Sequence, residues 1–336
     1  MKKFYTFLLL SLLCAGILTA CTKTNAESNN DIITLRIAHN QSTQHPVNKS
    51  LEKFVELVEE NTNKSVTGEI FANGELGEER AVLEMTQAGI IDITKVSGNT
   101  VETFEPTYTI FSVPYLFNDR EHLYKVMGSD VAEDIFQLTK DKGFFGLTWY
   151  DAGSRSFYTK NDKPILEPKD LKGLKIRVQP SDTLIRNVEL MGGSATPMPF
   201  NEVYTAMQQG VIDGAENNVT AMTDMNLGEV TKHFTFDEHM FTPDILLMNT
   251  DSFSALSKDQ QQAVKEAAME STQYHKELWE ETANEAIETA EDMGVEFHYP
   301  EKAPFQEAVK PLQDESAKNP NTAEYFKRIK EMGEEK

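Results

Sequence analysis

Two of the seven arginines in this 336-residue chain occupy positions that suit the binding of a small anion. Arg155 follows an apolar segment, 144–149, that is typical of a strand, and Arg177 ends a second such segment, 174–177. Ligands of open α/β sheets bind beyond the ends of the strands. A guanidinium grips a carboxylate through two parallel, charge-assisted hydrogen bonds, which a lysine does not provide. These arginines predict a carboxylate site, the alternative being that each pairs with a surface Asp or Glu.

The sequence offers no convincing catalytic or metal-binding set. It contains no G-x-S-x-G elbow, no phosphate loop that ends in Gly-Lys-Ser/Thr and no G-x-G-x-x-G fingerprint. The seven histidines are far apart, and the closest pairs, His39/His45 and His233/His239, lack the i, i+4 spacing that presents two ligands on one helix face. We therefore expect a binding protein and not an enzyme, without metal or cofactor, although histidines distant in sequence can still meet in space.

The N-terminus indicates export. Lys2 and Lys3 precede an apolar run, 4–18, that is too short to span a bilayer comfortably. The Leu-Thr-Ala that leads into Cys21 resembles a bacterial lipobox, which predicts removal of residues 1–20 and lipidation of Cys21. Residues 22–30 are polar and suit a flexible tether. We expect an extracytoplasmic protein anchored to the cell membrane, at the cell surface or in the periplasm; the alternative is an ordinary signal peptide.

Composition and length narrow the class further. The formal net charge of −22 becomes −22 − 2 = −24 without Lys2 and Lys3, which argues against nucleic acid and anionic lipid as partners. Cys14 lies in the expected signal, so Cys21 remains as the anchor and disulfides are excluded. The 336 − 20 = 316 residues that remain exceed the usual limit of about 250–300 for one core. Two lobes are therefore expected.

Two segments resemble each other in sequence and support two similar lobes. Residues 87–92 (QAGIID) match residues 208–213 (QQGVID), and each places a Gly between a helical pattern and an apolar run. Each lobe also begins with a similar strand pattern, at 35–38 and at 174–177. Helix and strand patterns alternate between these landmarks, which favours an α/β fold with mostly parallel sheets.

Residues 258–293 contain no Gly or Pro and follow a helical stripe. One continuous helix would be about 54 Å long at 1.5 Å per residue, more than one lobe's diameter. It would then run along both lobes; the alternative is two helices with a kink near Thr282. The expected division is 31–152 plus about 240–282 for lobe 1, and 153–239 plus about 283–330 for lobe 2.

Several motifs in order resemble the solute receptors of tripartite ATP-independent periplasmic (TRAP) transporters. The similarity runs from about residue 35 to about residue 310, and the segments that carry it are 74–80 (GELGEER), 113–117 (VPYLF), 153–155 (GSR), 168–178 (PKDLKGLKIRV), 196–204 (TPMPFNEVY) and 210–218 (GVIDGAENN). The resemblance implies a two-lobe periplasmic-binding-protein-like fold, with a ligand cleft between the lobes and a long helix that spans both.

The resemblance also implies roles for individual residues. Arg177 matches the family's main carboxylate partner and Arg155 its second basic contact. Phe200 matches a residue that packs on the ligand's carbon face, and Asn217 one that hydrogen-bonds the ligand. Asn40 and Glu79 match first-lobe positions that can reach hydroxyls, and Ser97 stands at a position that discriminates between substrates. Glu216, the neighbour of Asn217, is also expected to bind the ligand.

The resemblance points to a class of ligand and a partner. Ser97 stands where receptors for sialic acid carry an acidic residue, so sialic acid is disfavoured. Segments 157–159 and 215–218 resemble members that take sugar acids such as hexuronates. We expect a monomer that delivers its ligand to an ion-gradient-driven membrane permease. The alternatives are a C4-dicarboxylate or other organic-acid receptor, a receptor for an ATP-driven importer, a sensor subunit, and a sugar-acid lyase.

Overall fold

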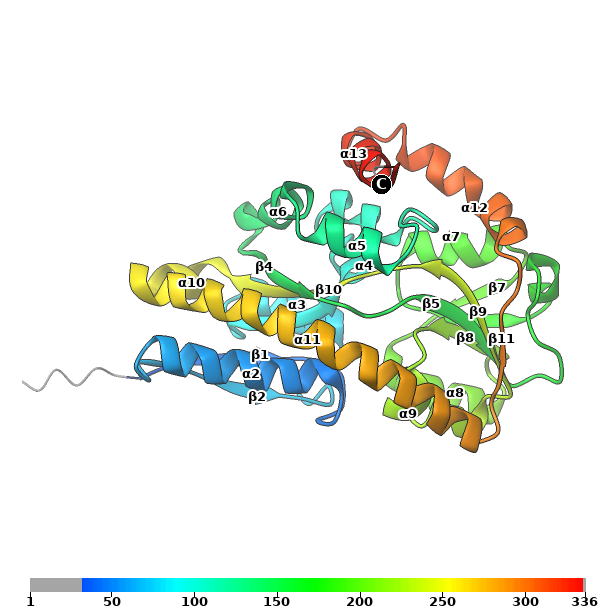
Figure 1. Cartoon of the computed structure of the whole chain (residues 1–336), viewed down its shortest axis with the longest axis horizontal. Helices are drawn as coiled ribbons and strands as arrows, with labels where there is room; N and C mark the ends of the chain where they lie inside the picture. Colours follow the sequence, from blue (N-terminus) through cyan, green and yellow to red (C-terminus); the bar gives the residue numbers. More distant parts are fainter. Residues whose placement is uncertain (1–31, 335–336) are drawn as a thin grey trace, which may run out of the picture. The chain divides into compact units, whose positions relative to one another are not determined.

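Two β-sheets organise the chain in the computed structural model, which describes residues 32–334 (Figure 1). The five-stranded sheet has the order β2-β1-β3-β10-β4, and the six-stranded sheet has the order β11-β9-β5-β8-β6-β7. The strands are β1 (Ile33–Ala38), β2 (Val66–Phe71), β3 (Ile93–Ser97), β4 (Phe144–Tyr150), β5 (Arg155–Thr159), β6 (Lys175–Val178), β7 (Ser194–Pro197), β8 (Gly214–Asn217), β9 (His233–Met240), β10 (Asp244–Asn249) and β11 (Glu296–His298).

Helices cover both sheets. The α-helices are α2 (Pro46–Asn61), α3 (Glu79–Gln87), α4 (Gly98–Val101), α5 (Arg120–Met127), α6 (Asp130–Gln137), α7 (Asp182–Leu190), α8 (Val203–Gln209), α9 (Ala221–Asp224), α10 (Thr250–Ala255), α11 (Lys258–Asp292), α12 (Ala303–Ser316) and α13 (Ala323–Glu334). Short 3₁₀ turns occupy Pro106–Ser112, Lys140–Lys142, Pro168–Leu171, Phe200–Glu202 and Leu227–Val230. β3 and β10 are buried along their whole length, as strands covered on both faces must be.

The chain passes between the sheets at two short strand connections. Residues 151–154 join β4 to β5, and residues 241–243 join β9 to β10. The strands of the five-stranded sheet therefore come from residues 33–150 and 244–249. Those of the six-stranded sheet come from 155–240 and 296–298. This arrangement is the expected two-lobe α/β fold, and we call the halves lobe 1 and lobe 2 after these sheets.

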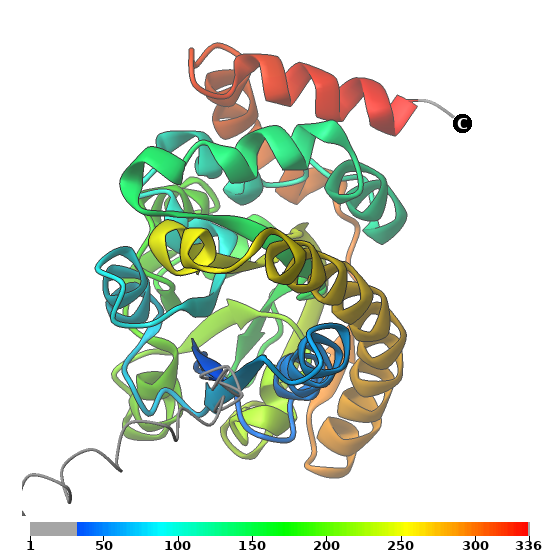
Figure 2. The ribbon, with the colours of Figure 1, turned by 90° about the vertical axis from the view of Figure 1, so that its left-hand side faces the viewer.

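The last helices contact both lobes. α12 packs on α7 and β9, whereas α13 packs on α5 and α6 of lobe 1 (Figure 2). The exact residue bounds at which the lobes divide stay a prediction.

The repeated segment forms the same joint in each lobe. α3 and α8 are followed by Gly89 and Gly210, whose φ angles of 71° and 75° lie in the left-handed region that glycine adopts at low cost. Asp92 then accepts a hydrogen bond from the backbone N–H of Arg36 at 2.8 Å, and Asp213 accepts one from that of Lys175 at 2.8 Å. Each aspartate thus holds the backbone of an inner strand of its sheet, β1 in lobe 1 and β6 in lobe 2.

α11 is one continuous helix of 35 residues and passes along both lobes, as the uninterrupted pattern predicts. Ser257 and Gln260 form a capping box at its start. Val264, Ala267 and Ala268 pack in a core of lobe 1, while Ala286 and Ala290 pack in a core of lobe 2. Figure 2 shows α11 lying beside α2. The alternative of two helices broken near Thr282 is wrong; the Thr282 hydroxyl only donates to the Leu278 carbonyl within the helix.

Candidate functional site

A cavity of about 180 Å³ lies where residues of both lobes meet. A neighbouring recess of about 30 Å³ shares five of its lining residues, which are Asn40, Glu79, Arg177, Gln179 and Phe200. Cavities that hold small ligands usually measure about 300–1,000 Å³. Both spaces are smaller than this range, and residues of lobe 1 and lobe 2 lie on either side of them.

The walls are built from strand ends, which is where open α/β sheets bind ligands. In lobe 1, Asn40 follows β1, Ser97 ends β3 and Glu79 begins α3. In lobe 2, Arg155 begins β5, which runs antiparallel to β8, and Asn217 ends β8. These residues are separated in sequence, and the sheet register brings them to one edge.

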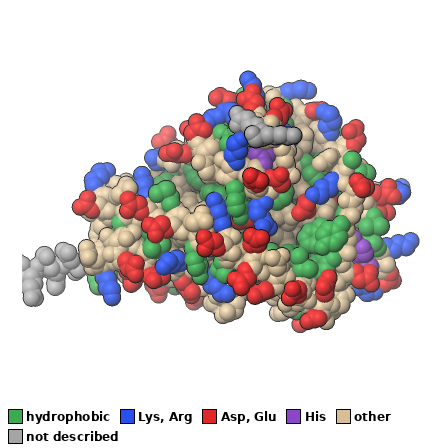
Figure 3. Space-filling model, in the orientation of Figure 1, with side chains coloured by type: hydrophobic (Ala, Val, Ile, Leu, Met, Phe, Trp, Pro, Cys, Tyr) green, Lys and Arg blue, Asp and Glu red, His purple; other side chains and the backbone are tan. Residues whose placement is uncertain are grey.

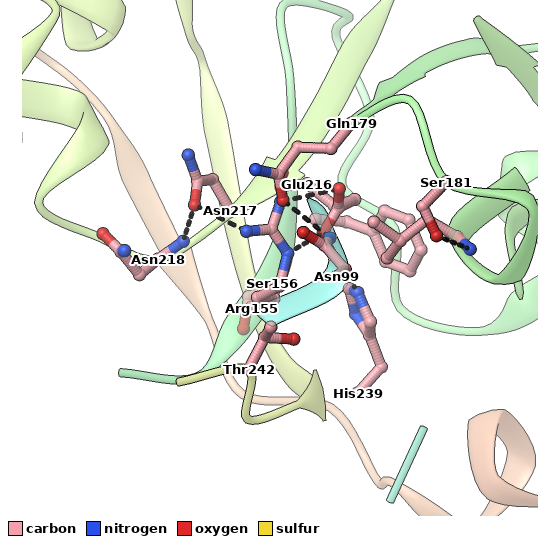
Figure 4. Close-up of polar contacts among 12 residues, drawn as sticks. Asn99, Arg155, Ser156, Gln179, Ser181, Glu216, Asn217, Asn218, His239 and Thr242 are labelled. Atoms are coloured by element: carbon pink, nitrogen blue, oxygen red, sulfur yellow. Dashed lines mark hydrogen bonds and ion pairs between the residues drawn. The ribbon is translucent and has the colours of Figure 1, made fainter. Parts of the chain in front are cut away.

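Arg155 is almost fully hydrogen-bonded by neighbouring protein groups (Figure 4). Its Nε donates to Oε2 of Glu216 at 2.6 Å and its Nη2 to Oε1 of Glu216 at 2.8 Å. Nη2 also donates to the Glu216 carbonyl at 2.9 Å, and Nη1 donates to Oδ1 of Asn217 at 3.2 Å. Arg155 is thus held in a fixed place by a bidentate ion pair, and its charge is neutralised before any ligand arrives.

The Glu216 carboxylate belongs to a buried chain of charged groups. Oε2 of Glu216 lies 3.5 Å from Nε2 of His239, and Nδ1 of His239 lies 2.8 Å from Oδ2 of Asp237. Burial opposes ionisation of Glu216, but Arg155 and the His239 contact lower its pKa to about 2. Burial also opposes the charged form of His239, but Asp237 and Glu216 raise its pKa to about 9. Glu216 and His239 are therefore both charged at neutral pH, and Glu216 holds Arg155 in place.

Arg177 differs from Arg155 in that part of its hydrogen-bonding capacity is unused within the described residues. It is only 1% exposed, its Nε donates to the Met198 carbonyl at 3.0 Å, and its Nη1 has no hydrogen-bond partner among residues 32–334. No carboxylate in that range forms an ion pair with it, and burial lowers its pKa. Its Cζ lies 5.7 Å from the centroid of the Phe200 ring. A desolvated guanidinium with an unused donor is costly and leaves a binding position for an anion.

The lobe 1 wall contains a buried lysine between two carboxylates. Nζ of Lys95 lies 3.2 Å from Oδ2 of Asp244 and 3.4 Å from Oε1 of Glu79, and it donates to Oδ1 of Asn40 at 3.3 Å. Burial disfavours the charged Lys95, but the two carboxylates raise its pKa. One cation against two carboxyl groups gives this wall no surplus positive charge. It offers polar groups that can bond to hydroxyls.

Several hydrogen bonds connect the two walls directly. Gln179 of lobe 2 accepts from Nδ2 of Asn99 at 2.9 Å and donates to Oε2 of Glu79 at 3.4 Å, both in lobe 1. Thr183 donates to Glu102 at 3.3 Å. Bonds of this kind form only when the lobes are close together, so the structure represents a closed arrangement.

The structure brings together most residues that the sequence singled out. Arg177, Arg155, Asn217, Phe200 and the lobe 1 residues Asn40, Glu79 and Ser97 all line the recess. Glu216 is not among the lining residues and lies behind Arg155. Whether these residues contact a ligand stays a prediction.

Sequence reasoning missed part of the lining. The missed residues are mostly polar groups within or directly after strands: Gln41, Lys95, Gln179, Asn218 and Asp244. Lys95 carried a readable signal, because it stands alone as a charged residue in the otherwise uncharged strand 93–97. Gln179 carried none, since an amide after a strand is ordinary.

A two-lobe α/β fold, a cavity lined by both lobes and a buried guanidinium with an unused donor are the features of a protein that binds a small anion. The sequence profile described as bacterial extracellular solute-binding protein, family 7, matches residues 37–319. A TRAP periplasmic solute-binding protein from Anaerococcus prevotii, solved with bound α/β-D-glucuronate, is 40% identical. The match has a TM-score of 0.88 and covers 90% of this chain and 99% of that one.

Two further comparisons agree. A TRAP periplasmic solute-binding protein from Xanthobacter autotrophicus, solved with β-D-galacturonate, is 34% identical. That match has a TM-score of 0.85 and covers 88% of this chain and 99% of the other. The C4-dicarboxylate-binding periplasmic protein DctP of Rhodobacter capsulatus is 31% identical over 85% of this chain and 86% of its own length. The chain therefore belongs to the extracellular solute-binding proteins of family 7, the receptors of TRAP transporters.

Within residues 32–334, none of the helices combines the length and the apolar character that crossing a bilayer requires. The predicted signal peptide, the lipidated Cys21 and the tether at 22–30 lie outside the described residues.

Proposed function

We propose that this chain captures a hexuronate, with D-glucuronate and D-galacturonate as the first candidates, and delivers it to an ion-gradient-driven TRAP permease. The single observation that carries the proposal is the Arg177 guanidinium. It is buried in the cavity wall, and its Nη1 has no hydrogen-bond partner in the part of the chain that the structure describes. The bound sugar acids of the two structural relatives support the same class of ligand.

The carboxylate of the ligand takes the unused donors of Arg177. Burial strengthens the attraction because little water screens the pair. Arg155 also contributes, since Asn217 and Glu216 hold it at the same recess. The formal net charge is −22, and acidic side chains are scattered over the face shown in Figure 3, so a locally basic cleft is required for an anion to enter.

The rest of the cavity favours a hydroxylated monocarboxylate over a dicarboxylate. Asn40, Ser97 and Asn217 offer donors and acceptors for hydroxyl groups, and Phe200 offers a flat apolar face for sugar C–H groups. The carboxylates of Glu79 and Asp244 outnumber the one ammonium of Lys95. A second ligand carboxylate would meet no unpaired cation on that wall. The C4-dicarboxylate alternative is supported by the likeness to the Rhodobacter receptor.

Capture occurs by closure about the connections 151–154 and 241–243. In the open state Arg177 is hydrated and receives the carboxylate. Gln179 then bridges to Glu79 and Asn99 as lobe 1 closes. A ligand stabilises the closed state only by the contacts that it makes there and not in the open one.

Location and partners complete the proposal. A lipid on Cys21 would hold the receptor at the membrane near its permease, with residues 22–30 as tether. The protein acts as a monomer, does not bind nucleic acid, and releases its ligand chemically unchanged. Incubation with D-glucuronate and mass spectrometry tests the last point, since any turnover would favour the lyase alternative.

A ligand screen tests the proposed function. Melting temperatures are measured with D-glucuronate, D-galacturonate, succinate and N-acetylneuraminate. A ligand at 100 times its dissociation constant adds about 2.7 kcal/mol to the free energy of unfolding. We expect both hexuronates to stabilise the protein and the other two acids to have little effect. A shift with succinate alone would mean that the ligand is a dicarboxylate and not a hexuronate. No shift with any of the four acids would contradict the carboxylate site.

A further inference from the structure

Two histidines and a glutamate meet at the free edge of the six-stranded sheet, away from the ligand cavity. β11 is the edge strand and lies beside β9 (Figure 1), with which it pairs in parallel. Glu296 therefore stands opposite His233, and His298 stands opposite Thr235. Glu296 and His298 are two residues apart on one strand and therefore point to the same face. His233 and His298 are 65 positions apart in the sequence, so sequence analysis did not reveal this group and predicted no metal site.

The three side chains have the spacing of metal ligands. Nδ1 of His233 lies 3.0 Å from Nε2 of His298 and 3.5 Å from Oε2 of Glu296. One ligand atom from each of the three residues falls within 4.8 Å of the others. Zinc binds imidazole nitrogen and carboxylate oxygen at about 2.0–2.2 Å, so tetrahedral ligands are about 3.3 Å apart. The two distances from Nδ1 of His233, 3.0 Å and 3.5 Å, bracket that value.

The surroundings favour an ion over a simple hydrogen bond between the rings. A hydrogen bond between the two imidazoles uses one donor and one acceptor, and it leaves the nearby Glu296 carboxylate without a role. The Glu296 side chain is 71% exposed, which supplies an entry path and leaves a fourth position for water. His233 is 8% exposed, and Glu296 N–H donates to the Lys232 carbonyl at 2.8 Å, so the strands hold the ligands in place. The neighbouring Lys232 ammonium is paired with Asp162, which limits its repulsion of a cation.

We propose that His233, Glu296 and His298 bind a divalent transition-metal ion of the Zn²⁺ type. Two imidazoles and one carboxylate suit Zn²⁺, Ni²⁺ or Cu²⁺, whereas Mg²⁺ and Ca²⁺ prefer oxygen ligands throughout. The ion would cross-link β9 to β11, a strand of only three residues that connects α11 to α12. Its role is to secure this connection, and it takes no part in binding the organic anion.

The test uses the full chain free of any polyhistidine tag, stripped with a chelator and titrated with ZnCl₂ by isothermal calorimetry. We expect one ion per chain, and a loss of at least about tenfold in affinity in His233→Gln and in His298→Gln. Zn²⁺ should raise the melting temperature of the wild type and leave that of both variants unchanged. Glu301→Gln, an exposed carboxylate just beyond β11, is the matched control and should bind Zn²⁺ as the wild type does.

Two results would overturn the proposal. One is wild-type protein that binds no Zn²⁺, and the other is equal binding by wild type and both histidine variants, which would mark scattered carboxylates as the ligands. The metal-free melting temperature of each variant shows whether it is folded. If a histidine variant does not fold, Glu296→Gln provides the test instead, because the exposed Glu296 side chain does not support the core. This substitution should weaken Zn²⁺ binding several-fold.

Discussion

Arg155 and Arg177 are both buried, both lie in the sheet of lobe 2 and both line the same recess, yet they are in opposite electrostatic states. Arg155 gives its donors to Glu216 and Asn217, and this partnership raises its pKa despite burial. Arg177 gives one donor to a backbone carbonyl, has no carboxylate partner among residues 32–334, and has a lowered pKa. We infer from this difference that Arg177, whose Nη1 is unused among the described residues, is the stronger candidate for the carboxylate partner.

Removal of Arg177 should have the largest effect. Loss of one partner of a desolvated charge pair costs about 2–5 kcal/mol, so Arg177→Ala should weaken hexuronate binding by tens- to thousands-fold in isothermal calorimetry. The variant should not lose stability, because the wild type already holds an uncompensated charge there. Arg186→Ala, which breaks an exposed ion pair with Glu315, is the control and should bind normally. Equal hexuronate affinity in Arg177→Ala and Arg186→Ala would contradict the role assigned to Arg177.

Disruption of the Arg155 partnership should act on stability first. Glu216→Gln keeps the size of the side chain but leaves Arg155 buried without its counter-charge, which costs about 3 kcal/mol or more. Urea unfolding of the ligand-free protein measures this loss. Glu315→Gln removes the partner of the exposed Arg186 and should change stability by less than about 1 kcal/mol. A Glu216→Gln variant as stable as the wild type would mean that Arg155 does not depend on its pair.

The pH dependence of stability should separate His239 from the neutral buried histidines. The folded pKa of His239 is about 9, above the ordinary 6.5, so its stabilising contribution is complete below pH 6.5 and is lost as pH rises through 9. Burial lowers the pKa of His39 and of His275 to about 4, so these residues destabilise the fold as pH falls from 6.5 towards 4.

His239→Gln should therefore lower the melting temperature below pH 6.5 by a constant amount and flatten the alkaline side of a plot of melting temperature against pH. Affinity for a hexuronate should vary less than stability between pH 7 and 9, because Arg177 stays charged in that range. An alkaline side that is identical in variant and wild type would contradict the charged state of His239.

Removal of the bridge at Gln179 should have the smallest effect. Gln179→Ala loses two hydrogen bonds that connect the walls, each worth about 1 kcal/mol. We expect a several-fold faster dissociation of ligand in stopped-flow displacement, with association nearly unchanged, because the bonds form after capture. Gln262→Ala, on the exposed face of α11, is the control. A slower association with unchanged dissociation would place Gln179 in the encounter step instead.

The sequence predicts the fold well because its strongest signals are local. Gly89 and Gly210 mark joints that need a positive φ angle, and the uninterrupted stretch after Ser257 permits one long helix. The resemblance adds Arg155, Arg177, Phe200 and some of the other lining residues, but not Lys95 or Gln179. The state of each arginine was beyond such reasoning, since it depends on which carboxylate the sheet register places beside it.

The same limit applies elsewhere in the chain. Lys95 and Asp244 are 149 positions apart by their numbers and meet because β3 and β10 pair antiparallel, with Leu246 opposite Lys95. His233 and His298 meet because β9 and β11 pair in parallel. Neither partnership follows from spacing along the chain. Charged groups within buried strands are the one local sign that such a partner exists.

A crystal structure of the D-glucuronate complex tests the central claim most directly. The account predicts that the ligand carboxylate accepts from Nη1 of Arg177 at about 2.7–2.9 Å, while the bidentate bonds between Arg155 and Glu216 persist. A bound sugar acid whose carboxylate lies elsewhere, with Nη1 of Arg177 still unpaired, would contradict it.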